Sequence, residues 1–316
     1  MTTGEAGFRT QARGLATAIS GEAREFTVDL RAPWRYLPGR MGAPFALGAL
    51  TAASDRPAPP WPDLLISCGR RTTALSIAIR KASGGRVTTV HVQNPLTDVR
   101  AFDLVIAMDH DGLAGPNVVS VPTALHDVTP ERLAKAAEAW RVRLSGAGPL
   151  AGVLLGGATR RGAFSAGGIG ALIDGLARLR REAGARLAIT PSRRTPTEAI
   201  AAFAARFAGD PDVFIWDGTG DNPYLGILAL SERLVVTSDS VSMISEALAT
   251  PHPVEVFGPD DGPRNARFLG ELVKRGLARR FTGDPTPARA GGPVDATAIA
   301  AASVRRMLQA RTGASG

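Results

Sequence analysis

The stretch from Leu234 to Leu248 constrains the fold of this chain more than any other. It opens with a short apolar run containing two valines, passes through a turn rich in hydroxyl and carboxylate groups, and continues with apolar residues three or four positions apart. This order predicts a strand, a tight turn and a helix, because a continuous apolar run suits a buried strand and the wider spacing suits one helix face.

The predicted helix start is a candidate phosphate-binding site. The first amides of a helix have no partner within it and carry a partial positive charge, so the turn with Ser238, Ser240 and Ser242 could hold a phosphate group. Glu246 lies further along the helix, where its carboxylate could reach a sugar hydroxyl. The simpler alternative is a serine cap on an ordinary helix with Glu246 in solvent, and the segment alone leaves both interpretations open.

The same strand–helix alternation recurs along the whole chain. A length of 316 residues suits two domains of roughly 150 residues each, and the glycine-rich segment 145–149 is the candidate linker. We therefore predict an α/β protein with parallel sheets in two domains, residues 1–147 and 148–316. The final helix, 296–308, is expected to pack back on the N-terminal domain. Strands are expected at 25–30, 63–69, 87–92, 102–108, 118–121, 151–155, 187–190, 213–216 and 253–257.

The first glycine loop of the chain has an unusual context. Gly4 and Gly7 precede a segment with helical spacing that includes Gln11. A glycine loop that opens a helix normally follows a strand, which aims the loop at its ligand, and no strand pattern precedes this one. We therefore expect the N-terminal domain to lack its first strand.

Composition narrows the class of protein. Hydrophobic residues make up 44% and charged residues 21% of the chain, and no apolar run approaches the length that spans a bilayer. Without a secretory signal pattern, the expected location is the cytoplasm. A single cysteine, Cys68, excludes an internal disulfide.

The net charge of +8 fits anionic ligands or an anionic membrane surface, although a genome-wide arginine bias would give the same balance. No dense basic stripe with interleaved aromatics occurs, so we predict no nucleic-acid partner. The loop Arg31 to Arg40 contains Trp34 and Tyr36, a composition that suits a weak contact with the inner face of a membrane. A solvated loop is the favoured alternative.

Candidate acid–base groups lie in the N-terminal domain near predicted strand ends. His91, His110 and Asp111 are the candidates for the base that accepts a proton from an acceptor hydroxyl. A histidine within a strand is more often a structural group. Adjacent residues at one strand end cannot all converge on one metal ion, so we predict no metal site.

Candidate phosphate contacts in the C-terminal domain also lie where strands end. Gly156 and Gly157 let the backbone approach a ligand, and Arg160 and Arg161 follow them. A second turn supplies hydroxyl and guanidinium groups suited to bidentate phosphate binding. A third, glycine-rich turn could frame a base or sugar. The second and third turns contribute Ser192, Arg193, Arg194, Asn222 and Tyr224.

Several motifs together resemble one family. They are Leu154-Leu-Gly-Gly-Ala-Thr-Arg-Arg161, Ser192-Arg-Arg-Thr-Pro196, Trp216-Asp-Gly218, Asn222-Pro-Tyr224, Thr237-Ser-Asp-Ser-Val-Ser-Met-Ile-Ser-Glu-Ala247 and Arg267-Phe268. In this order they are similar to the mitochondrial-fission "elongated mitochondria" family. That resemblance implies a GT-B-like fold, with two Rossmann-like domains facing a cleft and a nucleotide-sugar held by the second domain.

The resemblance also implies roles for particular residues. Ser240 and Ser242 would meet the diphosphate and Glu246 the ribose, while the loop with Gly4, Gly7 and Gln11 would lie on the acceptor side. The chain departs from the family pattern before this loop, where the strand is absent, and at Thr250-Pro-His-Pro253, where a glycine-containing turn is usual.

Three functions remain open from the sequence. The first is a glycosyltransferase that uses a nucleoside-diphosphate sugar, or another phosphorylated small molecule, and needs neither a metal nor another cofactor. The second is a non-catalytic binding or adaptor protein, since a fold does not fix a function. The third is a sugar-nucleotide epimerase with the same two-domain architecture.

Overall fold

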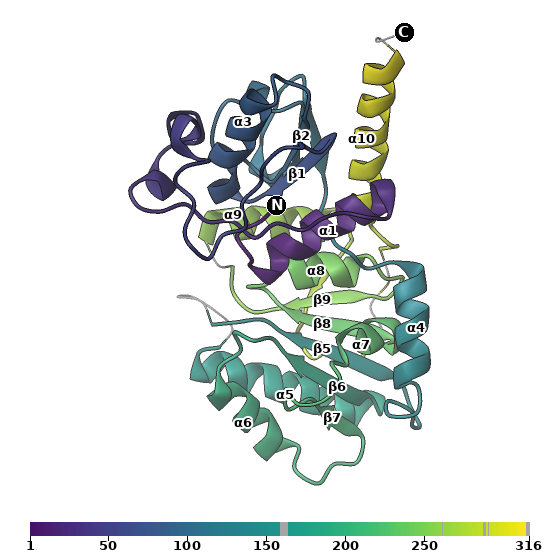
Figure 1. Cartoon of the computed structure of the whole chain (residues 1–316). Coiled ribbons are helices and arrows are strands. Elements are labelled where there is room, and N and C mark those ends of the chain that lie inside the picture. The colour runs from purple at the N-terminus through teal and green to yellow at the C-terminus, as the bar shows by residue number, and fades with distance from the viewer. Residues whose placement is uncertain (159–163, 261, 287–288, 290, 314–316) are drawn as a thin grey trace. The chain divides into compact units, whose positions relative to one another are not determined.

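The computed structural model describes residues 1–158, 164–260, 262–286, 289 and 291–313. The chain forms two compact units (Figure 1). Unit 1 comprises Met1–Asp127 together with the C-terminal segment Asp295–Gly316, and unit 2 comprises Val128–Val294. The segment 128–147, which the linker pattern assigns to the first domain, therefore belongs to unit 2, and the last helix belongs to unit 1.

Unit 1 is built on a parallel sheet in the order β1-β2-β3-β4, with every pair of neighbouring strands parallel. The central strands β2 and β3 are buried at every position, as expected for a sheet covered on both faces. Its elements are α1 (Ala6–Ser20), α2 (Gly39–Gly42), β1 (Leu64–Cys68), α3 (Thr73–Ala82), β2 (Thr88–Val92), β3 (Leu104–Met108), β4 (Val118–Val121) and α10 (Ala296–Gly313). The helix α10 packs against α1 and β4.

The first two residues occupy the place of a further strand beside β1. The amino group of Met1 donates to the Ile66 carbonyl at 2.8 Å, and the Cys68 N–H donates to the Met1 carbonyl at 3.1 Å. On the other side, Thr2 forms an isolated parallel bridge with Thr27. The predicted strand 25–30 is reduced to this bridge and a second one at Leu30, because the pairing segment is so short.

Met1 and Thr2 are among the residues that line a cavity of about 720 Å³. Phe26 and Ile66 line it from the two flanking segments, and Ala16, Ile79 and Leu308 line it from helices. Burial lowers the pKa of the Met1 amino group, which reaches into this apolar surrounding.

Unit 2 carries a sheet in the order β10-β9-β8-β5-β6-β7, again with every pair parallel. The chain first builds β5, β6 and β7 outward and then returns to the other side of β5 with β8, so the direction of winding reverses between β5 and β8. Its elements are α4 (Pro130–Trp140), β5 (Leu150–Leu155), α5 (Ala166–Ala183), β6 (Arg186–Pro191), α6 (Thr197–Arg206), β7 (Val213–Ile215), α7 (Tyr224–Leu230), β8 (Arg233–Thr237), α8 (Val241–Leu248), β9 (Val254–Phe257), α9 (Gly262–Lys274) and β10 (Arg279–Arg280).

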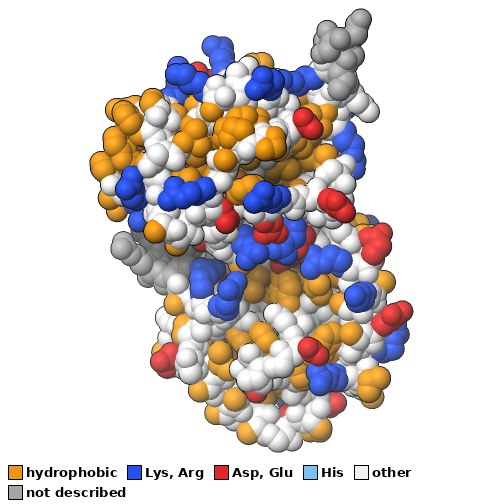
Figure 2. All heavy atoms as spheres, viewed as in Figure 1, with side chains coloured by type: hydrophobic (Ala, Val, Ile, Leu, Met, Phe, Trp, Pro, Cys, Tyr) orange, Lys and Arg blue, Asp and Glu red, His pale blue; other side chains and the backbone are white. Residues whose placement is uncertain are grey.

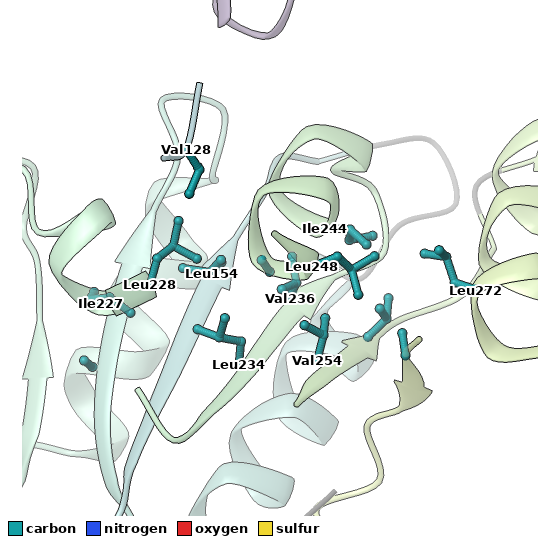
Figure 3. Packing of buried hydrophobic residues seen from close by; sticks show 14 of the residues in the cluster. Val128, Leu154, Ile227, Leu228, Leu234, Val236, Ile244, Leu248, Val254 and Leu272 are labelled. Carbon is teal, nitrogen blue, oxygen red and sulfur yellow. The ribbon is translucent and has the colours of Figure 1, made fainter. Parts of the chain in front are cut away.

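Alternate strand residues feed two separate cores on the faces of this sheet. Leu154 and Val236 point to the face covered by α7, α8 and α9, where they meet Ile244 and Leu248 (Figure 3). Val153 and Val235 point to the opposite face, which α5 and α6 cover. A period of two along each strand produces this division.

The packing of α4 against α7, and not the position of the glycine-rich linker, determines that α4 belongs to unit 2. A Cβ atom on Gly226 would lie 2.5 Å from the Trp140 ring, so only glycine lets α7 approach α4 this closely. Trp140 is buried in the same core as Ile227 and Leu228.

Within the described part of the chain, no helix combines the length and apolarity that crossing a membrane requires.

The cavity beside Met1 generates a prediction about stability. Adding the apolar residues Val-Ile-Val-Val before Met1 should raise Tm by about 5 °C or more, because the added strand fills the cavity and replaces the buried amino group by a paired amide. Thermal unfolding followed by circular dichroism measures the change. A Gly-Ser-Gly-Ser extension of equal length is the control, and an equal Tm for both extensions would contradict the proposed pairing.

Candidate functional site

The turns that follow β5, β6 and β8 meet at the point where the winding of unit 2 reverses. Ligands of open parallel sheets bind outside the carboxyl ends of the strands at such a point. The turn after β5 contains Gly156 and Gly157, the turn after β6 contains Ser192 to Thr195, and the turn after β8 contains Ser238 to Ser240. The sequence-predicted groups of these three turns are thus brought together.

Steric contact requires glycine at both positions of the β5 turn. The Gly156 N–H donates to Thr237 Oγ1 at 2.8 Å, and the Gly157 N–H donates to Asp239 Oδ2 at 2.7 Å. A Cβ atom on Gly156 would lie 2.2 Å from the Asp239 carboxylate. Both amides donate to groups of the protein itself, and the phosphate-binding role of these glycines stays a prediction.

Hydroxyl groups of the β6 turn fasten the β5 turn in place. Ser192 Oγ donates to the Gly156 carbonyl at 2.7 Å, and Thr195 Oγ1 donates to the Leu155 carbonyl at 3.0 Å. Ser192 is therefore a positioning group in this structure. Its predicted role as a direct phosphate contact does not follow from the geometry.

Asp239 is the central charged group of the site. Its side chain has no exposed surface, its Oδ2 accepts the Gly157 N–H, and the exposed Arg194 guanidinium lies 3.8 Å away. Burial raises the pKa of the Asp239 carboxyl, although the hydrogen bond from Gly157 acts in the opposite direction. Sequence reasoning passed over Asp239 as a site residue; the only signal was a carboxylate between serines at a predicted strand end.

The start of α8 presents backbone donors. Ser240 caps the helix by accepting the Met243 N–H at 3.4 Å, and Ser238 Oγ donates to the Pro259 carbonyl at 2.6 Å. The first bond within the helix runs from the Ile244 N–H to the Ser240 carbonyl. The amides of Val241 and Ser242 precede it and have no acceptor in the helix, so the anion-binding potential rests on them.

Tyr224 and Glu246 form a pair at the ends of α7 and α8. The Tyr224 hydroxyl donates to Glu246 Oε2, which places both predicted sugar-contacting groups in one spot. Asn222 Oδ1 accepts the Tyr224 N–H at 2.9 Å, so Asn222 orders the start of α7. A sugar hydroxyl could compete for the Glu246 carboxylate here.

The predicted arginines lie on the surface of the β6 turn. Arg193 and Arg194 are both exposed, so their guanidiniums can approach an anion, and that of Arg194 already lies beside the buried Asp239 carboxylate. Arg160 and Arg161 lie outside the described residues.

His91 occupies the interior of unit 1. Its Nδ1 lies 2.9 Å from Ser67 Oγ, its ring packs 4.9 Å from that of Phe102, and burial lowers its pKa to about 3. The ring has no exposed surface. An external substrate cannot reach this ring, so the structure does not support the predicted role of His91 as the base.

Other predicted groups of unit 1 do lie at a strand end. His110 and Asp111 belong to a short 3₁₀ turn directly after β3, with His110 Nε2 3.7 Å from Asp111 Oδ1. Gln11 is buried in α1 and accepts a hydrogen bond from Gln93 at 3.4 Å. Gly4 has a φ of 92°, which favours glycine, and Gly7 lies in the first turn of α1.

The fold is that of the GT-B class of α/β proteins. The chain is similar to the UDP-GlcNAc 2-epimerase from Methanocaldococcus jannaschii, with a TM-score of 0.55 and 14% identity, covering 78% of this chain and 77% of the other. It is equally similar to a putative UDP-N-acetylglucosamine 2-epimerase from Listeria monocytogenes, with a TM-score of 0.55 and 12% identity over 80% and 75% of the two chains.

The family follows from the sequence comparison. The model of the family described as Mitochondrial fission ELM1 matches residues 6–308, and the chain belongs to this family. It is 33% identical to the Mitochondrial fission protein ELM1 of Arabidopsis thaliana over 79% of its own length, and it spans 65% of that relative. It is 24% identical to the uncharacterized protein RP120 of Rickettsia prowazekii over 70% of its own length and 72% of that relative.

The buried carboxyl of Asp239 generates a pH-dependent prediction. Asn at position 239 keeps an acceptor for the Gly157 N–H but carries no charge. Since folding raises the pKa of Asp239, the stability contributed by the wild-type carboxyl is fully present below its unfolded pKa and is lost as pH rises through the folded pKa. Asp239→Asn should therefore raise Tm by about 2 °C or more near neutral pH.

The gain should shrink as pH falls toward about 4. Thermal unfolding across this pH range measures it, with Asp221→Asn in an exposed loop as the matched control. A Tm difference between Asp239→Asn and wild type that stays constant with pH would contradict the assignment.

Proposed function

We propose that unit 2 binds a nucleoside-diphosphate sugar and that the protein is a glycosyltransferase. The observation that carries this proposal is the convergence of the β5, β6 and β8 turns where the winding of the sheet reverses, beside the open amides of Val241 and Ser242. The diphosphate would accept hydrogen bonds from these two amides, since a helix start favours an anion.

The exposed guanidiniums of Arg193 and Arg194 would complete the diphosphate site. Glycosyl transfer leaves negative charge on the departing diphosphate, and positive groups that meet this charge lower the barrier. Arg194 already lies beside Asp239, which links the β6 turn to the start of α8. The Tyr224–Glu246 pair would receive a sugar hydroxyl, with the Glu246 carboxylate as acceptor.

Two alternative functions use the same site. An epimerase acting on a sugar nucleotide is supported by the fold shared with the two epimerase structures, and a non-catalytic adaptor is supported by the fission relative in the same family. The relative from Arabidopsis is longer than this chain. Any activity of that relative can therefore only be proposed for this chain.

A thermal-shift experiment tests the binding step. At about 100 times its dissociation constant, a bound nucleoside diphosphate should add about 2.7 kcal/mol of apparent stability. Val241→Pro removes one amide donor at the first helical position, where proline is tolerated, and Ser240 before it has a non-helical backbone with φ −107° and ψ 86°. We expect the ligand-induced shift to fall by half or more in Val241→Pro.

Val241→Ala is the matched control, because it shortens the side chain and keeps the amide. The shift in this control should equal that of the wild type. Absence of any shift with uridine, guanosine, adenosine and thymidine diphosphates and their sugars would overturn the proposed binding, as would equal shifts in the proline and alanine variants.

A second experiment separates the three functions. The protein is incubated with the sugar nucleotide that gives the largest shift, and the products are resolved by chromatography. Release of the nucleoside diphosphate would support transfer if the substitution Arg193→Ala lowers the rate of this release by about tenfold or more. Conversion of the sugar while still attached would support the epimerase, and binding without turnover would support the adaptor. Arg181→Ala, an exposed arginine on α5, is the control.

A further inference from the structure

A patch of exposed apolar side chains lies on unit 1, apart from the candidate site of unit 2. It consists of Tyr36, Met41, Phe45 and Leu96, which are 69%, 62%, 50% and 61% exposed. In Figure 2 hydrophobic side chains gather with Lys and Arg over the segment that Figure 1 draws in purple at the left. We call these four residues and the nearby arginines the apolar–arginine patch. The arginines are Arg31, Arg35, Arg40, Arg70 and Arg71.

Glycines hold the patch against the body of unit 1. A Cβ atom on Gly39 would lie 2.3 Å from Thr73 Cγ2, and one on Gly42 would lie 3.3 Å from the Ala74 side chain. The short helix α2 therefore packs directly on α3 through its glycines. Arg40 and Met41, the residues between them, are turned to the outside.

Two further contacts keep apolar side chains on the surface. Phe45 stacks on Trp34 with ring centroids 4.3 Å apart. Leu96 adopts a positive φ of 51°, uncommon for leucine, and its N–H donates to Asn94 Oδ1 at 2.9 Å. Such a costly backbone conformation, holding an exposed leucine, favours a functional reason for the exposure.

Positive charge surrounds the apolar side chains. Residues 30–54 contain Arg31, Arg35 and Arg40 and no acidic residue. A small hollow of about 180 Å³ is lined by Tyr36 and Leu96 together with the guanidinium-bearing residues Arg35, Arg70 and Arg71. Three carboxylates offset part of this charge: Asp29 lies 3.3 Å from both Arg35 and Arg71, Glu5 pairs with Arg71, and Asp98 lies 3.4 Å from Arg40.

We propose that the apolar–arginine patch docks on the surface of an anionic lipid bilayer. The apolar side chains would enter the interfacial region, and the arginines would meet lipid phosphates, with the hollow as the seat of one headgroup. Aromatic and arginine side chains are those enriched at membrane interfaces. The exposure of four apolar side chains together with arginines matches a surface that offers both an apolar interior and negative headgroups.

A labelling experiment tests where the protein meets the bilayer. Because the only cysteine of the sequence, Cys68, is buried, a new surface cysteine can be labelled alone with an environment-sensitive dye. The dye at Met41→Cys should brighten about twofold or more when vesicles with one third phosphatidylglycerol are added. The dye at Val142→Cys on unit 2, a residue that is 83% exposed, should not change.

A partition experiment separates the charged and apolar parts of the patch. Arg40→Gln/Arg70→Gln should weaken flotation with anionic vesicles by about tenfold or more, because each cation near an anionic surface strengthens the attraction to it. Tyr36→Ser/Met41→Ser should weaken it by a similar factor. Val142→Ser/Val273→Ser removes two exposed apolar side chains from unit 2 and should bind as wild type.

Unchanged Tm values identify variants that remain folded. The proposal is overturned if both patch variants float like the wild type, if neutral phosphatidylcholine vesicles bind equally well, or if the Val142→Ser/Val273→Ser control loses as much. Failure of the wild type to bind any vesicle would also overturn it, and an acidic protein surface would then be the partner that fits the charge. None of these readouts depends on nucleotide binding.

Discussion

The hydrogen bond from the Gly157 N–H to the Asp239 carboxylate is the contact on which the candidate site depends. It joins the turn after β5 to the turn after β8, the two strands between which the winding of unit 2 reverses. The carboxylate is fully buried, and a Cβ atom at Gly156 would overlap it. The contact therefore requires glycine on one turn and a short side chain with a carbonyl oxygen on the other.

Around this contact the polar groups divide into supporting and presenting roles. Ser192, Ser238 and Ser240 all form hydrogen bonds with the backbone and fix the shape of the turns. Among the described residues of these turns, the pair of amides at the start of α8 and the exposed arginines of the β6 turn are available to a ligand. A rigid, internally bonded frame that offers a few outward donors is well suited to orient an anion without rearrangement.

Unit 1 presents a different physical problem. Its sheet begins beside a cavity that Met1 and Thr2 only partly fill, and its surface exposes apolar side chains between arginines. In both places packing is incomplete within the unit itself. The cavity is lined by Leu64, Leu65 and Ile66 of β1, whereas the patch is held outward by close glycine packing and a positive φ at Leu96.

The sequence by itself determined the local elements and the family. Nearly every strand and helix was predictable from apolar spacing, because a period of two or near 3.6 follows directly from which faces are buried. The predicted strand 25–30 failed since its pairing partner, Met1–Thr2, is too short to extend the ladder. Only the tertiary structure decided that α4 belongs to unit 2, that His91 is an interior group, and that the Gly156 and Gly157 amides donate to Thr237 and Asp239. These outcomes depend on contacts between residues distant in sequence, such as Trp140 with Gly226. The spacing of residues along a local segment does not indicate which distant side chain will accept a hydrogen bond from a given amide.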